Sequence, residues 1–349
     1  MLQLEVLAWP AFNYKPFNPY NWLLNKNLER TGVSIIPFSI KNVFFSKFNI
    51  WHIHWPAENV LRGKNFTTYV RLTGFILILI YVKYFRNKKI VWTVHNHTLH
   101  DGRNPLLSEL FFNILSHFIS GLIFLSKNSR EEFLSKRKNY IGIKNKVIPH
   151  GHYKDWYPNE VDIHSARAKL NIGPNQFVIL FTGSIRPYKN VEQLIDIFNS
   201  LKDPNIFLLI AGKPSTKELE NLILQKISKN KNILFSPDWV RDEDFQFYFN
   251  AANLVVLPYN SILNSGAAIL ALSYNRPVLV PKIPSLLEYK ELLRTDHIIF
   301  YDGELNKDML QTTIGYLKKN TLDKINLEPL SWDNISKETK LFYEEIFEQ

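Results

Sequence analysis

The sequence contains no cysteine in its 349 residues. This absence excludes disulfide bonds, thiolate metal ligands and thiol nucleophiles, so other side chains must carry any chemistry. A reducing compartment is consistent with it, and we expect the protein in the cytoplasm. A hydrophobic content of 46% and an aromatic content of 14% are sufficient for two substantial cores, and the length is typical of two domains.

Long apolar runs are also scarce. Residues 1–10 have neither a basic region nor a long apolar core, so we predict no signal peptide. Residues 72–82 are intensely apolar, but a spanning helix needs about 20 such residues, so we do not expect it to span. Basic residues flank this segment, namely Arg71, Lys83, Arg86, Lys88 and Lys89. We favour a buried helix packed on a sheet; the alternative is a helix lying in a membrane interface.

Acidic residues are outnumbered by basic ones. The 42 basic and 32 acidic residues give a net charge of 42 − 32 = +10. A basic surface is suited to nucleic acid, to an anionic membrane or to an acidic substrate. The basic residues are spread along the chain, so charge alone does not choose among these partners. Low-complexity tracts and short repeats are absent as well.

Short apolar runs alternate with helical patterns along the whole chain. In the first half the predicted strands are 2–8, 33–38, 50–55, 89–94, 121–125 and 146–151, and the predicted helices are 22–31, 72–82, 108–118 and 128–135. In the second half the predicted strands are 177–183, 206–212, 233–235, 254–257 and 277–281, and the predicted helices are 191–201, 218–228, 242–250 and 266–273. This alternation predicts an α/β protein of two doubly wound domains, divided near residues 150–170.

Ligands of open parallel sheets bind beyond the carboxyl ends of the strands. The strand ending at Gly183 is followed by Ser184, and this pair permits a tight turn. Arg186 and Lys189 place two cations beside that turn. A guanidinium and an ammonium on one turn are suited to a diphosphate, although a solvated basic loop would have the same sequence.

A second turn follows the strand at 254–257. The segment SILNSGAAILALSYNRPV covers residues 261–278. Asn264, Ser265 and Gly266 offer backbone N–H groups at the start of an Ala/Leu-rich helix, whose positive end attracts an anion. Two anion sites at strand ends of one domain predict a nucleoside diphosphate ligand.

In this order, the motifs resemble the donor-binding domain of GT-B glycosyltransferases that use nucleotide sugars. The resemblance covers nearly the whole chain and rests on GSIRPYKN (183–190), LLIAGKP (208–214), FSPDWVRDEDFQFYFNAANLVVLPY (235–259), SGAAILALSYNRPVLVP (265–281) and LSWDNISKETKLFY (330–343). It implies two Rossmann-like domains facing a cleft: an acceptor-side domain at 1–155, a donor-binding domain at 156–330, and a terminal helix at 331–349 packing back across the cleft.

The resemblance also implies roles for individual residues. Arg186 and Lys189 would bind the donor diphosphate, with Gly183 and Ser184 in the same turn, and the backbone around Ser265 would hold the distal phosphate. The positions it places near the nucleotide base are Asp238, Val240 and Arg241. The donor, a UDP- or GDP-sugar, is a substrate rather than a cofactor, and enzymes of this fold are usually metal-independent.

The segment departs from the family in lacking an acidic pair. The positions where glutamates are usual fall near Ile262 and Leu270, neither of which can bind sugar hydroxyls through its side chain. Glu288 follows the strand that ends at Pro281 and is our candidate for contacting the sugar; a surface glutamate on a helix is the alternative.

A histidine-rich loop follows the strand at 89–94. His95 stands at the strand end, and His97, His100 and Asp101 follow within seven positions. Asp101 or a histidine would act as the base if the anomeric configuration inverts. If the configuration is retained, the resemblance implies that His95 positions the sugar. The sequence leaves these two mechanisms open.

Acceptor-binding candidates lie in the loop at 9–20 and in the strand at 50–55. Aromatic rings and amides of Asn13, Asn18 and Tyr20 are suited to stacking on a sugar and hydrogen-bonding to it, with interdomain packing as the alternative. His54 is a further candidate, as is His97, whereas strand alternation makes one or both of His52 and His54 structural.

These patterns predict a glycosyltransferase that moves a hexose from a nucleoside diphosphate to a glycan or a lipid-linked saccharide, in bacterial surface polysaccharide or glycolipid synthesis. Peripheral attachment to the inner face of the membrane fits the charge. One alternative is a nucleotide-sugar epimerase or hydrolase. The other is a non-enzymatic nucleic-acid-binding protein, but no recognition helix or basic arm supports it, and we expect no nucleic acid partner.

Overall fold

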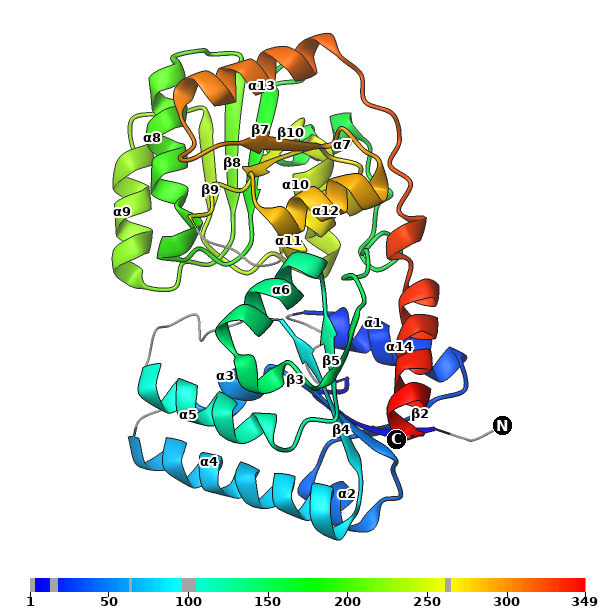
Figure 1. Ribbon diagram of the computed structural model, residues 1–349. Coiled ribbons are helices and arrows are strands. Elements are labelled where there is room, and N and C mark those ends of the chain that lie inside the picture. The colour runs from blue at the N-terminus through cyan, green and yellow to red at the C-terminus, as the bar shows by residue number, and fades with distance from the viewer. Residues whose placement is uncertain (1–3, 13–17, 63–64, 96–104, 261–264, 349) are drawn as a thin grey trace. The chain divides into compact units, whose positions relative to one another are not determined.

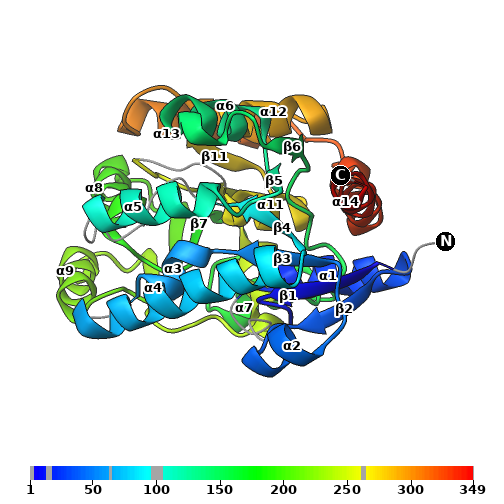
Figure 2. The ribbon, with the colours of Figure 1, turned by 60° about the horizontal axis from the view of Figure 1, so that its bottom comes forward.

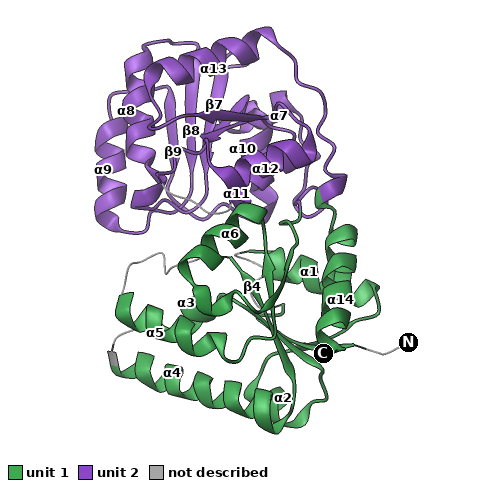
Figure 3. Cartoon of the chain, in the orientation of Figure 1, with its two compact units in different colours: residues 1–151, 330–349 green, residues 152–329 purple. Residues whose placement is uncertain are grey.

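The chain forms two compact units in a computed structural model that describes residues 4–12, 18–62, 65–95, 105–260 and 265–348 (Figure 1). Residues 1–151 and 330–349 make the N-terminal unit, and residues 152–329 make the C-terminal unit (Figure 3). The units therefore divide after Gly151, a few residues before the predicted position. The terminal helix completes the N-terminal unit, so this unit is built from two separate stretches of the sequence.

The N-terminal unit contains a six-stranded sheet in the order β2-β1-β3-β4-β5-β6, and all its strand pairs are parallel. Its strands are β1 (Glu5–Trp9), β2 (Ser34–Pro37), β3 (Ile50–His54), β4 (Lys89–Val94), β5 (Gly121–Phe124) and β6 (Lys144–Val147). Its α-helices are α1 (Tyr20–Arg30), α2 (Ile40–Phe45), α3 (Pro56–Val60), α4 (Asn65–Ile80), α5 (Pro105–Ser116), α6 (Lys127–Lys136) and α14 (Trp332–Phe347). A π-helical turn, η1 (Tyr81–Phe85), and a 3-10 turn, η2 (Lys138–Tyr140), complete it.

The C-terminal unit repeats this plan with a parallel sheet in the order β12-β11-β10-β7-β8-β9. Its strands are β7 (Phe177–Thr182), β8 (Ile206–Ala211), β9 (Ile233–Ser236), β10 (Leu254–Val256), β11 (Val278–Pro281) and β12 (Ile298–Tyr301). Its α-helices are α7 (Ile163–Lys169), α8 (Val191–Leu201), α9 (Lys217–Ile227), α10 (Phe245–Ala251), α11 (Gly266–Ser273), α12 (Pro284–Leu293) and α13 (Lys307–Lys319), and its 3-10 turns are η3 (Pro187–Lys189), η4 (Asp242–Asp244) and η5 (Glu328–Leu330). The predicted α/β fold of two Rossmann-like, doubly wound sheets is confirmed.

Strand β3 shows how alternation sorts side chains between the two faces of the N-terminal sheet. All five of its residues are buried. Trp51 and Ile53 belong to the apolar core that contains the buried side chains of α4 and α5. His52 and His54 point the other way: the ring of His52 meets Tyr343 of α14, and that of His54 meets Tyr20 of α1. One face of the sheet is therefore apolar, and the other carries histidines.

The apolar helix is longer than the sequence predicts. It begins at Asn65 rather than at residue 72, and η1 continues it to Phe85. Arg71 does not interrupt it, because this residue lies on an exposed side of the helix. The helix from Phe66 to Phe85 has 20 residues, and it is long and apolar enough to cross a membrane, with 28% of it buried in the protein. The prediction of a wholly buried helix is thus wrong for one of its faces.

Candidate functional site

The sheet of the C-terminal unit changes its direction of winding between β7 and β10. These strands are neighbours, but the chain runs outward through β8 and β9 from one of them and through β11 and β12 from the other. The loops that leave neighbouring strands at such a point separate, which opens a crevice at the carboxyl ends. Both predicted phosphate-binding turns leave from this point.

The turn after β7 is held closely against the turn after β8. Gly183 has a φ of 111°, a region that favours glycine, and Gly212 has a φ of 153°. A Cβ atom on Gly212 would lie only 2.0 Å from the carbonyl oxygen of Gly183. The backbone N–H of Ile185 also donates to the carbonyl of Lys213 over 2.8 Å. This packing fixes the backbone from which the two predicted cations project.

Lys189 ends turn η3 with its ammonium folded back toward the start of the loop. A Cβ atom on Gly183 would lie 3.3 Å from Nζ of Lys189. Burial and, secondarily, the charge of Arg186 lower the pKa of Lys189 to about 8. Within the described residues, Lys189 makes no ion pair with a carboxylate. Two cations concentrated on one turn, one of them partly desolvated, form a site that an oxyanion would stabilise.

Tyr259 joins this turn to the second one. Nζ of Lys189 lies 5.6 Å from the centroid of the Tyr259 ring. The Tyr259 hydroxyl is hydrogen-bonded with the side chain of Ser265, and burial raises the pKa of this hydroxyl. The backbone is tied as well, since the N–H of Asn260 donates to the carbonyl of Tyr188 over 3.0 Å. The two predicted anion-binding turns are therefore neighbours in the structure.

Ser265 caps helix α11, which begins at Gly266 as predicted. Its side-chain oxygen accepts from the N–H of Ala268 over 3.1 Å, and the residue is 3% exposed. The hydroxyl therefore serves the helix and Tyr259, and the first-turn N–H groups at the helix N-terminus remain as donors for an anion. Asn264 and Ile262 lie outside the described residues.

Two further predictions concern the sugar and the base. Glu288 lies on α12, which follows β11, the strand next to β10, and its side chain is half-buried. The base-region candidates Asp238, Val240 and Arg241 lie between β9 and η4. Arg241 forms ion pairs over 2.7 Å with Asp244 and over 3.3 Å with Glu243, which hold this loop beside β9.

In the N-terminal unit, the predicted site begins at His95, directly after β4. Nε2 of His95 lies 3.0 Å from Nδ1 of His54, the last residue of β3, and both rings are buried. This contact leaves Nδ1 of His95 as the ring nitrogen that His54 does not engage. A cavity of about 10 Å³, lined in part by His95, Trp55 and Glu58, lies beside the ring. This volume is of the order of one water molecule.

The histidine pair continues into a buried polar network. Nε2 of His52 lies 2.7 Å from the Thr93 hydroxyl, and Nδ1 lies 2.6 Å from the Tyr343 hydroxyl. Burial lowers the pKa of His52 to about 3, and burial followed by neighbouring charges holds the pKa values of His54 and His95 well below their usual range. These rings are therefore neutral at pH 7 and act as hydrogen-bonding groups rather than cations.

Aromatic rings surround His95 on several sides. Trp55 stacks on it with centroids 4.2 Å apart, from a left-handed backbone at φ 48°. Such a conformation is costly for a non-glycine residue and persists only where its surroundings fix it. Tyr20 meets His95 edge-on at 5.0 Å and lies 4.7 Å from His150.

The predicted acceptor residues of the first loop are placed as follows. Tyr20 is only 2% exposed, so its ring supports His95 and presents no open face to a sugar. Oδ1 of Asn18 accepts from the N–H of Tyr20 over 3.0 Å and thereby forms the turn into α1. The other acceptor-side predictions, Asn13, His97, His100 and Asp101, lie outside the described residues.

Sequence reasoning missed four members of these clusters. Tyr259 reads as part of an apolar strand, and Tyr343 is 291 positions from His52, so no local pattern connects that pair. His150 and Trp55 had a signal, because each follows directly on a predicted strand or stands at its end. In the described parts of the chain, no group of three or more His, Cys, Asp and Glu side chains is arranged to hold a metal ion.

Comparison with known proteins places these clusters in a family. Residues 162–308 match the model for the family described as glycosyl transferases group 1. A GDP-mannose:glycolipid 4-beta-D-mannosyltransferase from Xanthomonas campestris pv. campestris is 27% identical over 288 residues, which cover 80% of this chain and 75% of that protein.

Solved structures share the arrangement of both sheets at low sequence identity. Sucrose-phosphate synthase from Thermosynechococcus elongatus has a TM-score of 0.69 at 13% identity, over 99% of both chains. HepE from Anabaena, in complex with UDP-glucose, has a TM-score of 0.64 at 15% identity, over 99% of this chain and 98% of that one. At these identities the likeness concerns the fold.

Proposed function

Because the chain is a group 1 glycosyltransferase with the GT-B fold, we propose that it transfers a hexose from a nucleoside diphosphate sugar to a glycan or a lipid-linked saccharide. The observation that carries the proposal is the pair of cations, Arg186 and Lys189, on a turn next to the N-terminus of α11 at the switch point of the sheet. A diphosphate leaving group requires this combination of positive charge and backbone N–H groups.

Each part of the donor site has a distinct role in this proposal. Arg186 and Lys189 bind the diphosphate and neutralise the charge that develops as it leaves. The N–H groups around Gly266 hold the distal phosphate. Because these groups are fixed before the reaction, we propose that transfer proceeds without a metal, and chelators should leave the turnover unchanged.

The sugar is held by groups other than the usual acidic pair. Leu270, at one of the positions where the family has glutamates, is an apolar residue on α11 and is 9% exposed. We propose that the backbone around residues 264–267, Glu288 and the histidine-rich loop contact the sugar instead. His95 enters as a neutral hydrogen-bonding group, which suits positioning of a hydroxyl. Whether Asp101 or a histidine removes the acceptor proton depends on the stereochemistry of transfer.

Donor and acceptor are proposed from the relatives. The Xanthomonas relative is named for GDP-mannose and a glycolipid, so GDP-mannose and a lipid-linked saccharide are our first choices, in surface polysaccharide or glycolipid synthesis. UDP-glucose is the second donor to test, because HepE was solved with it. A glycolipid acceptor would place the enzyme peripherally on the inner face of the membrane.

A thermal-shift screen of GDP, UDP and their sugars tests the donor assignment. A ligand that binds only the folded protein raises Tm in proportion to the logarithm of its concentration above Kd. Turnover is then measured with and without a membrane extract as the source of acceptor. Donor consumption that requires no acceptor would indicate an epimerase or a hydrolase, and no Tm response to any nucleotide would contradict the proposal.

A further inference from the structure

Large apolar side chains are exposed together on one part of the N-terminal unit. They belong to α2, to the continuous helix α4–η1 and to α5, and we call this surface the apolar face. Its members are Ile40, Phe44, Phe45, Phe66, Val70, Leu77, Tyr84, Phe85, Leu106 and Leu110, each between 43% and 82% exposed. In both Figure 1 and Figure 2, α4 and α5 run side by side, and the rings of Phe75 and Phe111 stack between them at 5.8 Å.

Helix α4 is apolar on two opposite sides. Leu72, Phe75 and Leu79 face the core and are at most 7% exposed. Phe66, Val70 and Leu77 are separated by four and seven positions, which places them on one stripe of a helix with 3.6 residues per turn. Their exposed fractions are 79%, 56% and 61%. A surface helix of a soluble protein is usually polar on this outer side, so the second apolar stripe requires an explanation.

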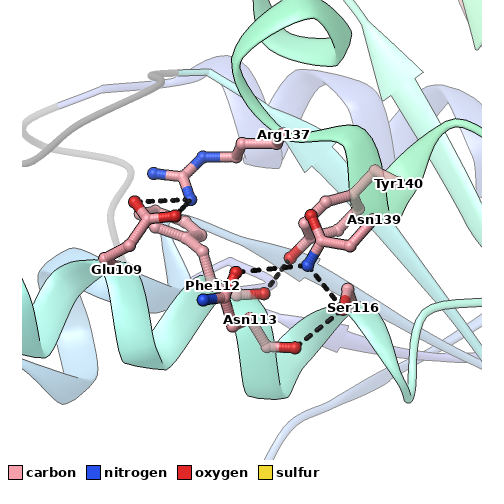
Figure 4. A network of polar contacts seen from close by, with 7 residues as sticks. All are labelled: Glu109, Phe112, Asn113, Ser116, Arg137, Asn139 and Tyr140. Carbon is pink, nitrogen blue, oxygen red and sulfur yellow. Dashed lines mark hydrogen bonds and ion pairs between the residues drawn. The ribbon is translucent and has the colours of Figure 1, made fainter.

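The exposed residues belong to helices that are firmly attached. On α5, Glu109 pairs with Arg137 over 3.1 Å, and the Tyr140 hydroxyl donates to the Phe112 carbonyl over 2.6 Å (Figure 4). On α2, the guanidinium of Arg86 donates to three carbonyls at the end of that helix. Phe44 of α2 also packs on Tyr81 of η1, with centroids 4.6 Å apart. The exposure is therefore a property of the folded unit.

Positive charge is concentrated around this face. Between residues 38 and 90 the sequence has nine basic residues and one acidic residue, Glu58, so this stretch holds 9 − 1 = +8 of the net charge of +10. The described basic residues of this stretch make no ion pair with a carboxylate in the part of the chain that the structure describes. Exposed aromatic and aliphatic side chains bordered by lysine and arginine complement the interface of an anionic bilayer.

We propose that the apolar face docks on an anionic membrane surface, with α4 lying in the interface and its outer stripe in contact with lipid. This extends the peripheral attachment proposed above by assigning the residues, and it depends on that attachment but not on the identity of the donor. Phe66, Leu77 and Phe85 insert among the acyl chains, and Lys41 and Lys47 meet the head groups.

Two other occupants of this face are disfavoured by the structure. α4–η1 connects β3 to β4, which pair in parallel, so both of its ends are fixed to one sheet and it cannot cross a bilayer without leaving the core. A second copy of the chain would bring two stretches of charge +8 together, and like charges at an interface oppose association.

Vesicle flotation tests the proposal with the intact protein. The wild type should float with phosphatidylcholine vesicles that contain phosphatidylglycerol, less with phosphatidylcholine alone, and less at high salt. Leu77→Ser with Phe85→Ser should weaken binding at least about ten-fold, since apolar contact is lost. Leu341→Ser, on the exposed side of α14, is the matched control.

Charge is tested in the same assay. Lys41→Gln and Lys47→Gln should each weaken binding roughly five-fold, the effect of one basic residue near an anionic surface. Lys229→Gln and Lys231→Gln, on the C-terminal unit, should leave it unchanged. All variants should keep the thermal response to the donor nucleotide, which separates a failed membrane face from a failed donor assignment.

The absence of cysteine allows insertion to be measured directly. Leu77→Cys and Leu341→Cys can each be labelled with an environment-sensitive fluorophore, without competing thiols. The label at 77 should shift to the blue with anionic vesicles, and the label at 341 should not. Equal behaviour at both positions, no flotation of the wild type at low salt, or a dimer in solution that Leu77→Ser dissociates would each overturn the proposal.

Discussion

Nδ1 of His54 and Nε2 of His95 lie 3.0 Å apart, so the last residue of β3 holds the first residue after β4. Both rings are neutral, because burial holds the pKa of each well below its usual range. One nitrogen of the pair must donate and the other accept. The tautomer of His54 therefore determines which tautomer His95 adopts, and with it whether Nδ1 of His95 offers a proton or a lone pair.

Replacing His54 should disturb turnover more than donor binding. We expect His54→Ala to lower kcat at least about ten-fold, which corresponds to about 1.4 kcal/mol, and to leave the KM for the donor nearly unchanged. His54→Asn, which keeps a polar group near the Nδ1 position, should recover part of kcat. His297→Ala, in the C-terminal unit, is the control. A purely structural role for His54 would give equal losses in Ala and Asn variants that track their Tm values.

Removing the ammonium of Lys189 should weaken donor binding. A hydrogen bond to a charged group contributes about 1.5–3 kcal/mol, so Lys189→Ala should raise the Kd for the nucleoside diphosphate roughly 10- to 100-fold. Calorimetric titration measures this directly. Lys229→Ala removes an exposed lysine of the same unit and should bind as the wild type does. Unchanged affinity in Lys189→Ala would contradict the diphosphate assignment.

The affinity for the diphosphate should also depend on pH through the same residue. The pKa of Lys189 is lowered to about 8, and a bound diphosphate favours the protonated form. Below pH 8 the ammonium is already present, and above it binding must take up a proton. The Kd should therefore rise above pH 8, approaching about ten-fold per pH unit. In Lys189→Ala this rise should be absent, and its persistence there would assign the effect to another group.

Stability should fall in mild acid because of the buried histidines. The pKa values of His52 and His150 are lowered to about 3 and about 4 by burial, whereas an unfolded histidine titrates near 6.5. Below pH 6.5 the unfolded state binds more protons than the folded state. Each such histidine therefore removes up to about 1.4 kcal/mol from the free energy of unfolding per pH unit, until its folded pKa is reached.

Urea denaturation between pH 7.5 and 4.5 measures this slope. His52→Gln removes one titrating group and should flatten the slope of the N-terminal unit by the contribution of one histidine. Since the two units differ in their histidines, the transition of the C-terminal unit should shift less. An equal slope in wild type and variant would show that His52 is not buried in its neutral form.

Gly212 should not tolerate a side chain. A Cβ atom there would meet the carbonyl oxygen of Gly183 at 2.0 Å, and a φ of 153° is unfavourable for other residues. Gly212→Ala should therefore lower both Tm and nucleotide affinity, because the turn that carries Arg186 and Lys189 must shift. Gly315→Ala, in α13 with open space around it, should be neutral or stabilising by up to about 1 kcal/mol. Equal Tm values for the two variants would exclude the proposed packing.

The sheets and the donor turns were predictable because their signals are local. Continuous apolar runs such as 206–211 mark buried parallel strands, and the turn at 183–190 combines glycine with two cations within a few positions. Helix α13 was not predicted, although Asn306 caps it and Leu310 and Ile314 have helical spacing. The length of α4 was underestimated because Arg71 was taken as a boundary, whereas a long side chain at an exposed position does not end a helix.

Contacts between distant residues could not be read from the sequence. Tyr343 reaches His52 across 291 positions, and the contact exists only because α14 returns to the N-terminal unit. Tyr259 likewise gains its place between Lys189 and Ser265 only when β10 lies beside β7. Such contacts follow from topology, which one sequence specifies only through the complete fold.

The return of α14 has a consequence for the order in which the chain is made. A ribosome releases residues 152–329 before residues 332–347, so the C-terminal unit can close while the N-terminal unit still lacks a helix. Until α14 emerges, His52 has no phenol beside it, and Gly151 lacks the indole of Trp332. The second domain in the sequence is thus the first able to finish folding during synthesis, and the histidine cluster is assembled last.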